Sequence, residues 1–395
     1  MLHRFIKLSL ASASAMLFAA GVSANAQADE IRIGVIAAFS GPYSNWGKQI
    51  QDATELYVAQ HNGRAGEHTI KLIYRDVGGN NPARARQLAE ELVVREKVQY
   101  VSGLEFTPTA LAVADVATQS KVPFIIINAG TSGILARSPY MLRAGYTQWM
   151  VATPLAKWTA EQGGKRVVLA VADYAPGADA LTSFKKSFNE EKGEIVGELK
   201  IPLNTSDFST YMQKIKEAAP DYVYMFTPVG PLSVAFIKAF VDRGLDKSGI
   251  KLLATAETEE SELPSYGDAA AGIVTALHYS PASTTPANQA FVSAFRKKYG
   301  NDKTPNVASI AAYDAMKMIY EMIRATNGKQ DGDKAMAAIK GYAWESPRGP
   351  VSVDPQTREL IQNIYIRRIE KVDGVYMNKP FKTYPAIRDP GIKIQ

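Results

Sequence analysis

Short runs of β-branched residues alternate with amphipathic segments from Glu30 to near the end of this chain. The alternation is typical of parallel strands joined by crossover helices, because a parallel strand can rejoin its sheet only through a long connection. The sequence therefore predicts an α/β fold with doubly wound parallel sheets. Strands are expected at residues 31–37, 70–74, 100–102, 123–127, 166–171, 222–226 and 251–254.

Two helix starts carry a capping residue followed by proline, Asn81-Pro82 and Thr107-Pro108. The unit that begins at residue 31 is echoed by the unit that begins at residue 166, as if one doubly wound unit had been used twice. Further helices are predicted at residues 46–61, 178–191, 208–218, 231–243, 288–299, 306–325 and 334–340. Late strands are predicted at residues 351–353 and 361–369, with a hairpin turn at 371–374.

The beginning of the chain predicts a secretory signal peptide over residues 1–26. Arg4 and Lys7 precede an apolar run at 8–22, and Ala24-Asn25-Ala26 supplies the small residues that a signal peptidase reads. Cleavage is expected after Ala26 or Ala28. An apolar run this short is a poor membrane span, so we expect a soluble mature protein in the periplasm.

Length, cysteine content and charge restrict the remaining possibilities. A mature chain of roughly 370 residues exceeds the usual size of one hydrophobic core, which predicts two domains. The chain has no cysteine, which excludes disulfides, thiol catalysis and thiolate metal sites. Its 45 lysine and arginine residues against 39 aspartate and glutamate residues are spread along the chain. Without a basic block, a nucleic-acid partner is not expected.

Enzyme motifs are sparse. The sequence has no HExxH, Walker loop, GxGxxG or GxSxG, and the histidines of the mature chain, His61, His68 and His278, are scattered. We therefore predict no enzyme, no cofactor and no metal site. An SxxK spacing at Ser183/Lys186 and at Ser248/Lys251 leaves an acylating hydrolase as a remote alternative, although the accompanying SDN and KTG elements are missing.

Several stretches follow one another in a recognisable order along the mature chain. They are GVIAAFSGPYSNWG (34–47), Asp76 with Asn81-Pro82, Val101-Ser102-Gly103 leading to Thr107, VPFIIINAGT (122–131), Asp207-Phe208-Ser209, residues 220–223 and Arg348-Gly349-Pro350. Together they resemble the leucine/isoleucine/valine-binding family of type I periplasmic binding proteins.

The resemblance implies two doubly wound lobes that close on a solute by a hinge motion. Three crossover segments are then expected near residues 143–147, 274–277 and 346–350. Lobe 1 would comprise residues 29–144 and 276–348, and lobe 2 residues 145–275 and 349–395. The implied function is solute binding for an ABC importer, with an amino acid or a small, possibly aromatic, carboxylic acid as solute. We expect a monomer that docks on the permease subunits of the inner membrane; an extracytoplasmic ligand sensor with the same fold is the alternative.

In lobe 1, the resemblance assigns the solute's carboxylate and amino group to Thr107, Ala129, Gly130 and Thr131. These residues follow predicted strands, where loops and helix starts offer hydroxyls and free amides. The alternative is that Thr107 only caps its helix and Thr131 only turns the chain. Trp46 matches a position that closes over the solute, unless it simply packs between elements. Tyr146 and Trp149, near the first crossover, are weaker candidates.

Lobe 2 departs from the family pattern. The contacts expected here are Tyr174 and Pro176, then Phe226 and Pro228, and the prolines stand where binders of branched-chain amino acids carry aromatic residues. Loss of ring hydroxyls favours a bulkier or aromatic acid. Glu257 is the candidate partner for an α-amino group, with Glu259 or Glu260 as substitutes. Alternatively, residues 256–262 form a solvated acidic loop.

Overall fold

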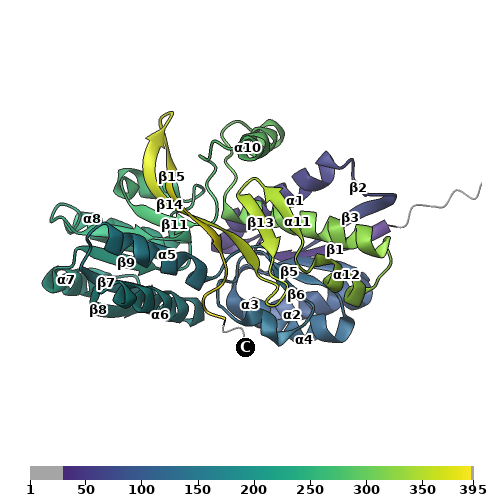
Figure 1. Cartoon of the computed structure of the whole chain (residues 1–395), viewed down its shortest axis with the longest axis horizontal. Coiled ribbons are helices and arrows are strands. Elements are labelled where there is room, and N and C mark those ends of the chain that lie inside the picture. The colour runs from purple at the N-terminus through teal and green to yellow at the C-terminus, as the bar shows by residue number, and fades with distance from the viewer. Residues whose placement is uncertain (1–29, 393–395) are drawn as a thin grey trace, which may run out of the picture.

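The computed structural model describes residues 30–392, which form two α/β lobes side by side along the long axis of the molecule (Figure 1). The predicted leader, residues 1–26, lies outside the described residues. Each lobe is built on its own sheet with helices packed against it (Figure 1). The predicted α/β class with two doubly wound lobes is confirmed.

The sheet of lobe 1 has six strands in the order β2-β3-β1-β4-β5-β6. Strand β2 runs antiparallel to β3, and the other neighbours are parallel. Ile31, Ile33 and Val35 of β1 are fully buried, as expected of a parallel strand covered on both faces. The strands are β1 (Glu30–Ala37), β2 (Arg64–Ala65), β3 (His68–Asp76), β4 (Tyr100–Gly103), β5 (Phe124–Ile126) and β6 (Met141–Arg143).

The helices of lobe 1 come from two parts of the chain. They are α1 (Ser44–Gln60), α2 (Pro82–Glu90), α3 (Thr107–Ala112) and α4 (Ala114–Ser120), and, after the second crossover, α10 (Pro286–Tyr299), α11 (Val307–Thr326) and α12 (Gly332–Ile339). Helix α11 packs against α1. Helix α1 comes so close to the end of β1 that a Cβ on Gly47 would lie 2.1 Å from the Ala38 carbonyl oxygen. The cap predicted for α2 is confirmed, because the Asn81 side chain accepts from the Arg84 amide at 3.0 Å.

The second sheet has nine strands in the order β12-β13-β14-β11-β10-β9-β7-β8, with β15 paired to β14. Strands β7 to β11 are mutually parallel, while β12 to β15 pair antiparallel. Val372 pairs with Val375, which confirms the predicted hairpin turn. The strands are β7 (Arg166–Ala172), β8 (Glu194–Ile201), β9 (Tyr222–Phe226), β10 (Lys251–Ala254), β11 (Val274–Leu277), β12 (Ala343–Ser346), β13 (Gly349–Val353), β14 (Leu360–Val372) and β15 (Val375–Ile387).

Alternate residues of β7 serve two cores in lobe 2. Val167 and Leu169 belong to the larger core with Phe184 of α6, whereas Val168 and Ala170 belong to the core with α7 and α8. This period of two is what a strand with helices on both faces requires. The helices are α5 (Gln148–Glu161), α6 (Ala175–Glu190), α7 (Ser209–Ala218), α8 (Pro231–Asp242) and the short α9 (Leu263–Tyr266).

The crossovers agree with the prediction at one place and differ at two. Residues 143–147 connect β6 of the first sheet to α5 on the second. Residues 274–277 form strand β11, and residues 346–350 form the β12–β13 turn. The third crossover runs along strand β14 instead. Arg358, just before β14, donates to the Met141 carbonyl in lobe 1. Later residues of β14 pair with β11 in the second sheet. Pairing in the sheet bonds the buried backbone groups of β11, which a loop there would leave without partners.

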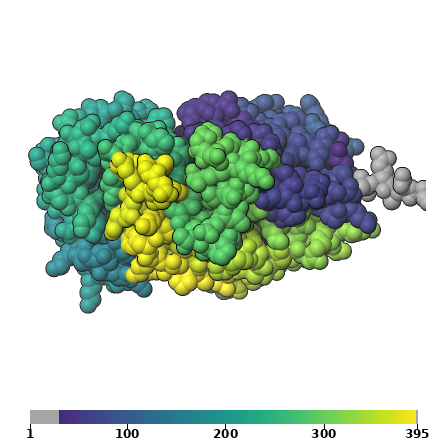
Figure 2. Space-filling view, turned by 90° about the horizontal axis from the view of Figure 1, so that it is seen from above, coloured from purple at the N-terminus to yellow at the C-terminus, as the bar shows by residue number. Residues whose placement is uncertain are grey.

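Later segments cover the junction between the lobes. In the space-filling view from above, the green segment that contains α10 and the yellow C-terminal hairpin lie over the boundary between the teal lobe and the purple and blue lobe (Figure 2). No helix within residues 30–392 is long and apolar enough to cross a membrane.

Candidate functional site

A cavity lies between the lobes, at the carboxyl ends of parallel strands from both sheets. It contains about 580 Å³ of space not filled by protein atoms, counting the part open to solvent. Loops that follow β1, β4, β5, β6, β7, β9 and β10 form the wall. The wall residues are Tyr43, Trp46, Glu105, Phe106, Thr107, Asn128, Gly130, Tyr146, Gln148, Tyr174, Pro176, Phe226, Thr227, Pro228, Val229 and Ala256.

Thr107 lies in the wall but does not cap its helix, contrary to the prediction. Phe106 has extended backbone dihedrals and occupies the cap position, while Thr107 is the first helical residue. The Thr107 hydroxyl instead donates to the Thr131 hydroxyl at 3.0 Å. This bond ties the start of α3 to the loop after β5.

The loop at residues 129–131 is bonded to the side chain of Arg143, which is fully buried. Its guanidinium donates to the carbonyls of Ala129 and Thr131, each at 2.8 Å, and its Nε lies 3.0 Å from a Glu359 carboxylate oxygen. Ala129 has a φ of 33° and is buried. Of the three loop residues predicted to bind solute, Gly130 is in the wall, whereas Ala129 and Thr131 are not.

Aromatic rings dominate both halves of the wall. Tyr43 and Phe106 of lobe 1 meet edge to face, with ring centroids 4.8 Å apart. Tyr174 and Phe226 of lobe 2 lie nearly parallel, with an interplanar angle of 7° and centroids 6.1 Å apart. The predicted lobe 2 residues, Tyr174, Pro176, Phe226 and Pro228, all line the cavity, as does Trp46 of lobe 1.

The first crossover contributes Tyr146 and Gln148. The Tyr146 ring lies 5.2 Å from that of His278, which is fully buried at the end of β11. Gln148 donates its backbone amide to the Gly130 carbonyl at 2.8 Å, so it joins the two lobes at the cavity. Trp149 is outside the wall, and its ring lies below the Lys186 ammonium.

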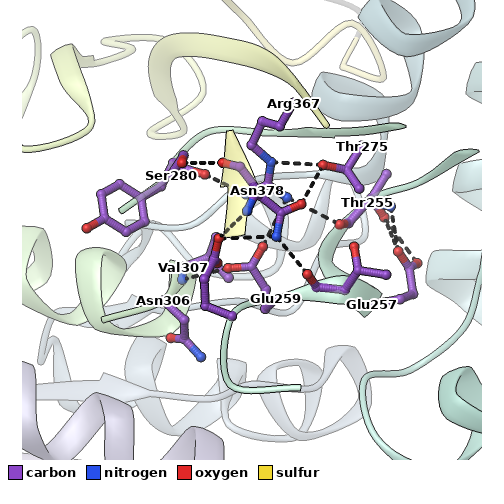
Figure 3. A network of polar contacts seen from close by, with 12 residues as sticks. Thr255, Glu257, Glu259, Thr275, Ser280, Asn306, Val307, Arg367 and Asn378 are labelled. Carbon is purple, nitrogen blue, oxygen red and sulfur yellow. Dashed lines mark hydrogen bonds and ion pairs between the residues drawn. The ribbon is translucent and has the colours of Figure 1, made fainter. Parts of the chain in front are cut away.

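Glu257 lies beside the cavity and not in its wall, because other groups hold its carboxylate. The carboxylate accepts from the Thr255 amide at 2.6 Å and from the Thr255 hydroxyl (Figure 3). It also accepts from the Thr227 amide at 3.3 Å. Burial raises the pKa of Glu257 to about 7. Both carboxylate oxygens of Glu257 are therefore bonded to groups of the protein itself.

The neighbouring glutamates are structural. Glu259 pairs with Arg367 at 3.0 Å and also accepts from the Val307 amide at the start of α11. Glu260 accepts from the Asn378 amide at 2.9 Å. The alternative of a solvated acidic loop is wrong for these positions, because residues 256–260 are all buried.

Some polar atoms in the wall lack a partner among the described residues. They are Trp46 Nε1, Gln148 Oε1 and Thr227 Oγ1, and each belongs to a side chain that is at most 5% exposed. Leaving a buried polar atom unbonded costs about 1–3 kcal/mol. A solute that supplies partners for these atoms would recover part of that cost.

Sequence reasoning missed half of the wall. Tyr43, Glu105, Phe106, Asn128 and Val229 sit next to residues that it named, in the same loops after strands. The position of a loop at a strand end was therefore informative, but which of its side chains turns inward depends on loop geometry. Gln148, Thr227 and Ala256 were missed for the same reason.

The serines of the two SxxK spacings are bonded to backbone carbonyls. Ser183 donates to the Asp179 carbonyl of its own helix, and Ser248 donates to the Leu245 carbonyl. Lys186 and Lys251 lie over aromatic rings instead of beside those hydroxyls. Within residues 30–392, no group of three or more histidine, aspartate or glutamate side chains is placed to hold a metal ion.

Known proteins share this architecture over nearly the whole chain. A family model described as periplasmic binding protein matches residues 30–374. The Leu/Ile/Val-binding protein homolog 6 of Brucella melitensis is 45% identical over 372 residues, which cover 94% of this chain and 95% of that protein. The resemblance predicted from the sequence is thereby confirmed.

Solved structures of solute-binding proteins have the same fold as this chain. A solute-binding protein of an ABC transporter from R. palustris, in complex with 4-hydroxybenzoate, is 44% identical with a TM-score of 0.89, and the match covers 92% of this chain and 99% of that one. One from Rhodopseudomonas palustris BisB5, in complex with 3,4-dihydroxybenzoic acid, is 43% identical with a TM-score of 0.87 and the same coverage. The chain therefore belongs to the periplasmic binding protein family, as a solute-binding protein of the ABC-transporter type.

Proposed function

We propose that this protein binds a small aromatic carboxylate between its lobes and delivers it to an ABC importer of the inner membrane. The related R. palustris proteins were solved with 4-hydroxybenzoate and 3,4-dihydroxybenzoic acid, which are ligands of this class. The signal peptide predicted at residues 1–26 supports export to the periplasm. The division of the chain that we propose follows the prediction, residues 29–144 and 276–348 in lobe 1 and 145–275 and 349–395 in lobe 2, except that β11 (Val274–Leu277) and β12 (Ala343–Ser346) pair within the sheet of lobe 2.

The aromatic side chains in the cavity wall are the observation that supports this proposal most. Tyr43 and Phe106 on one side and Tyr174 and Phe226 on the other provide ring faces and edges for an aromatic solute. Pro176 and Pro228 add apolar surface on the lobe 2 side. Apolar walls with a few polar groups are typical of small-molecule sites.

A carboxylate has neutral donors available in lobe 1. The wall, as described, contains no lysine, arginine or histidine. The backbone amides of Thr107 and Gly130 and the Trp46 indole N–H are the candidates to donate to the anion, because the Thr107 hydroxyl already donates to Thr131. Ala129 and Thr131 belong to the same loop as Gly130 and are proposed to support it. Charge-assisted hydrogen bonds contribute roughly 1.5–3 kcal/mol each, so a few of them support about micromolar affinity.

An amino acid is the less favoured solute. Its ammonium group needs an acidic partner, and the carboxylate of Glu257 is already engaged by Thr255 and Thr227. The carboxyl group in the wall, Glu105, accepts from the Ala38 amide, and burial raises its pKa to about 7. An aromatic acid without an ammonium group avoids this requirement.

A thermal-shift experiment tests the solute class. Purified mature protein is heated with 4-hydroxybenzoate or with leucine, each at up to millimolar concentration. A ligand at about 100 times its dissociation constant stabilises the folded protein by about 2.7 kcal/mol. We expect 4-hydroxybenzoate to raise the melting temperature and leucine to leave it unchanged; the reverse result would reject the aromatic class in favour of amino acids.

A further inference from the structure

Thr227 is a buried hydroxyl in the lobe 2 wall that has no partner. It follows Phe226 at the end of β9, is 1% exposed, and its Oγ1 makes no hydrogen bond within residues 30–392. Buried hydroxyls in native proteins are nearly always bonded. An unbonded one in a cavity wall therefore points to a bond that is completed by the solute.

The backbone around Thr227 is fixed by Glu257. The Thr227 amide donates to Glu257 Oε1 at 3.3 Å, and the other Glu257 oxygen accepts from the Thr255 amide at 2.6 Å. Figure 3 shows Glu257 turned toward Thr255, with dashed lines to its amide and hydroxyl. Because a buried carboxylate holds this loop, the backbone that carries the Thr227 hydroxyl is fixed before any solute binds.

The surroundings of Thr227 separate it from the donors assigned to the carboxylate. Its neighbours in the lobe 2 wall are the apolar groups Phe226, Pro228 and Val229. The other unpartnered wall atoms are Trp46 Nε1 and Gln148 Oε1. Trp46 belongs to lobe 1. The Gln148 side-chain amide lies against Gly130 of lobe 1, because a Cβ added to Gly130 would be 3.2 Å from Gln148 Nε2. Within residues 30–392, Thr227 Oγ1 is thus the unpartnered wall atom that lies in the loop after β9, among apolar neighbours.

We propose that the Thr227 hydroxyl binds a hydroxyl group on the ring of the aromatic acid and makes the protein select hydroxylated over unsubstituted benzoates. A para-substituted benzoate carries its carboxylate and its hydroxyl at opposite ends, and the cavity offers matching groups on opposite lobes. Discrimination follows because a ligand without the hydroxyl leaves the buried Thr227 group unbonded. This inference rests on the proposed function, since it assumes an aromatic acid in the cavity.

Calorimetric titrations of the mature protein test the assignment. The ligands are 4-hydroxybenzoate, benzoate and 4-methylbenzoate, which replaces the hydroxyl by a methyl group of similar size. The variants are Thr227→Val, which has nearly the same shape without the hydroxyl, and Thr227→Ser, which keeps it. We expect Thr227→Val to weaken 4-hydroxybenzoate binding roughly 10- to 100-fold. Benzoate binding should change by less than about threefold, and Thr227→Ser should retain the preference of the wild type.

The outcomes separate this inference from the proposed function. Benzoate affinity in Thr227→Val reports whether the variant is folded, and Thr227→Ser provides a second variant if it is not. An unchanged ratio of the two affinities in Thr227→Val, or a wild type with no preference for 4-hydroxybenzoate, overturns the role of Thr227 while the aromatic class stands. A wild type that binds none of the three acids overturns the proposed function itself.

Discussion

Arg143 is the side chain on which the lobe 1 half of the cavity most depends. It binds three loop carbonyls, those of Ala129, Thr131 and Tyr146, and pairs with Glu359 in a fully buried position. Such a residue specifies where the loop lies without touching the cavity. Its position at the end of a strand gave no sign of this role in the sequence.

Removal of Arg143 should therefore destabilise the fold strongly. Arg143→Met leaves the Glu359 carboxylate buried without its ion-pair partner, which costs about 3–5 kcal/mol of the free energy of unfolding. Denaturation by urea measures the change. The matched control is Arg166→Met, since Arg166 is 45% exposed and its pair with Glu194 contributes at most about 1 kcal/mol. Similar losses in both variants would contradict the assignment.

Glu257 should make stability depend on pH. Burial raises its pKa in the folded protein to about 7, whereas a glutamate in an unfolded chain titrates near pH 4.3. The folded state therefore binds the proton more tightly, and the contribution of Glu257 to the free energy of unfolding falls as pH rises from about 5 to 8. Glu257→Gln cannot titrate, so its melting temperature relative to wild type should rise over this range.

The control for this pH series is Asp207→Asn. The Ser209 amide bonds to Asp207 and lowers the pKa of that exposed carboxyl, so its contribution changes only at acid pH. Melting curves at pH 5, 6, 7 and 8 should show a constant difference from wild type for this variant. A constant difference for Glu257→Gln as well would show that Glu257 remains charged throughout.

At the scale of elements, the start of α6 depends on a close approach between helix and strand. A Cβ on Gly177 would lie 1.8 Å from the backbone oxygen of Ala172, the last residue of β7. Gly177→Ala must therefore push the helix start, with the wall residue Pro176, away from the sheet. We expect a loss of about 1–3 kcal/mol in stability together with weaker binding of 4-hydroxybenzoate.

Gly197→Ala is the matched control for Gly177→Ala. Gly197 lies on the edge strand β8, where an added Cβ would meet only the Val168 side chain at 3.3 Å. Unfolding curves and titrations of both variants give the comparison. If Gly177→Ala bound and unfolded like Gly197→Ala, the close approach of α6 to β7 would not position the cavity wall.

The elements that sequence reasoning found are those with strong local patterns. Buried parallel strands such as β1 and β9 are nearly continuous apolar runs, and Asn81-Pro82 is an unambiguous helix start. Strand β8 was not predicted, because it is an edge strand that exposes Glu194 and Glu198 and so lacks a continuous apolar run. Helix α5 was not predicted, because Pro154 lies inside it and proline usually ends a helix. Local pattern is a poor guide where tertiary packing decides the structure.

About half of the cavity wall could be predicted from the sequence. Trp46, Thr107, Gly130 and the lobe 2 residues Tyr174, Pro176, Phe226 and Pro228 were placed in the wall because they follow strands and match family positions. The roles of Ala129 and Glu257 depend on contacts with Arg143, Thr255 and Thr227, which lie elsewhere in the sequence. Such contacts follow from the folded arrangement and leave no local pattern.

At the scale of the whole molecule, both lobes contribute walls to the cavity, as expected of a closed form. Solute that touches both walls stabilises this form over an open one. A shift from 99:1 open to 1:99 requires about 5.5 kcal/mol of preference. Small-angle scattering should show a smaller radius of gyration with 4-hydroxybenzoate than without it, and no change with leucine. An unchanged radius with a bound aromatic acid would contradict hinge closure.

A crystal structure of the mature protein with 4-hydroxybenzoate tests the central claim most directly. We predict the ring among Tyr43, Phe106, Tyr174 and Phe226, with its carboxylate toward Thr107 and Gly130. Ligand bound elsewhere on the surface, with the interlobe cavity filled by the protein's own side chains, would contradict the account.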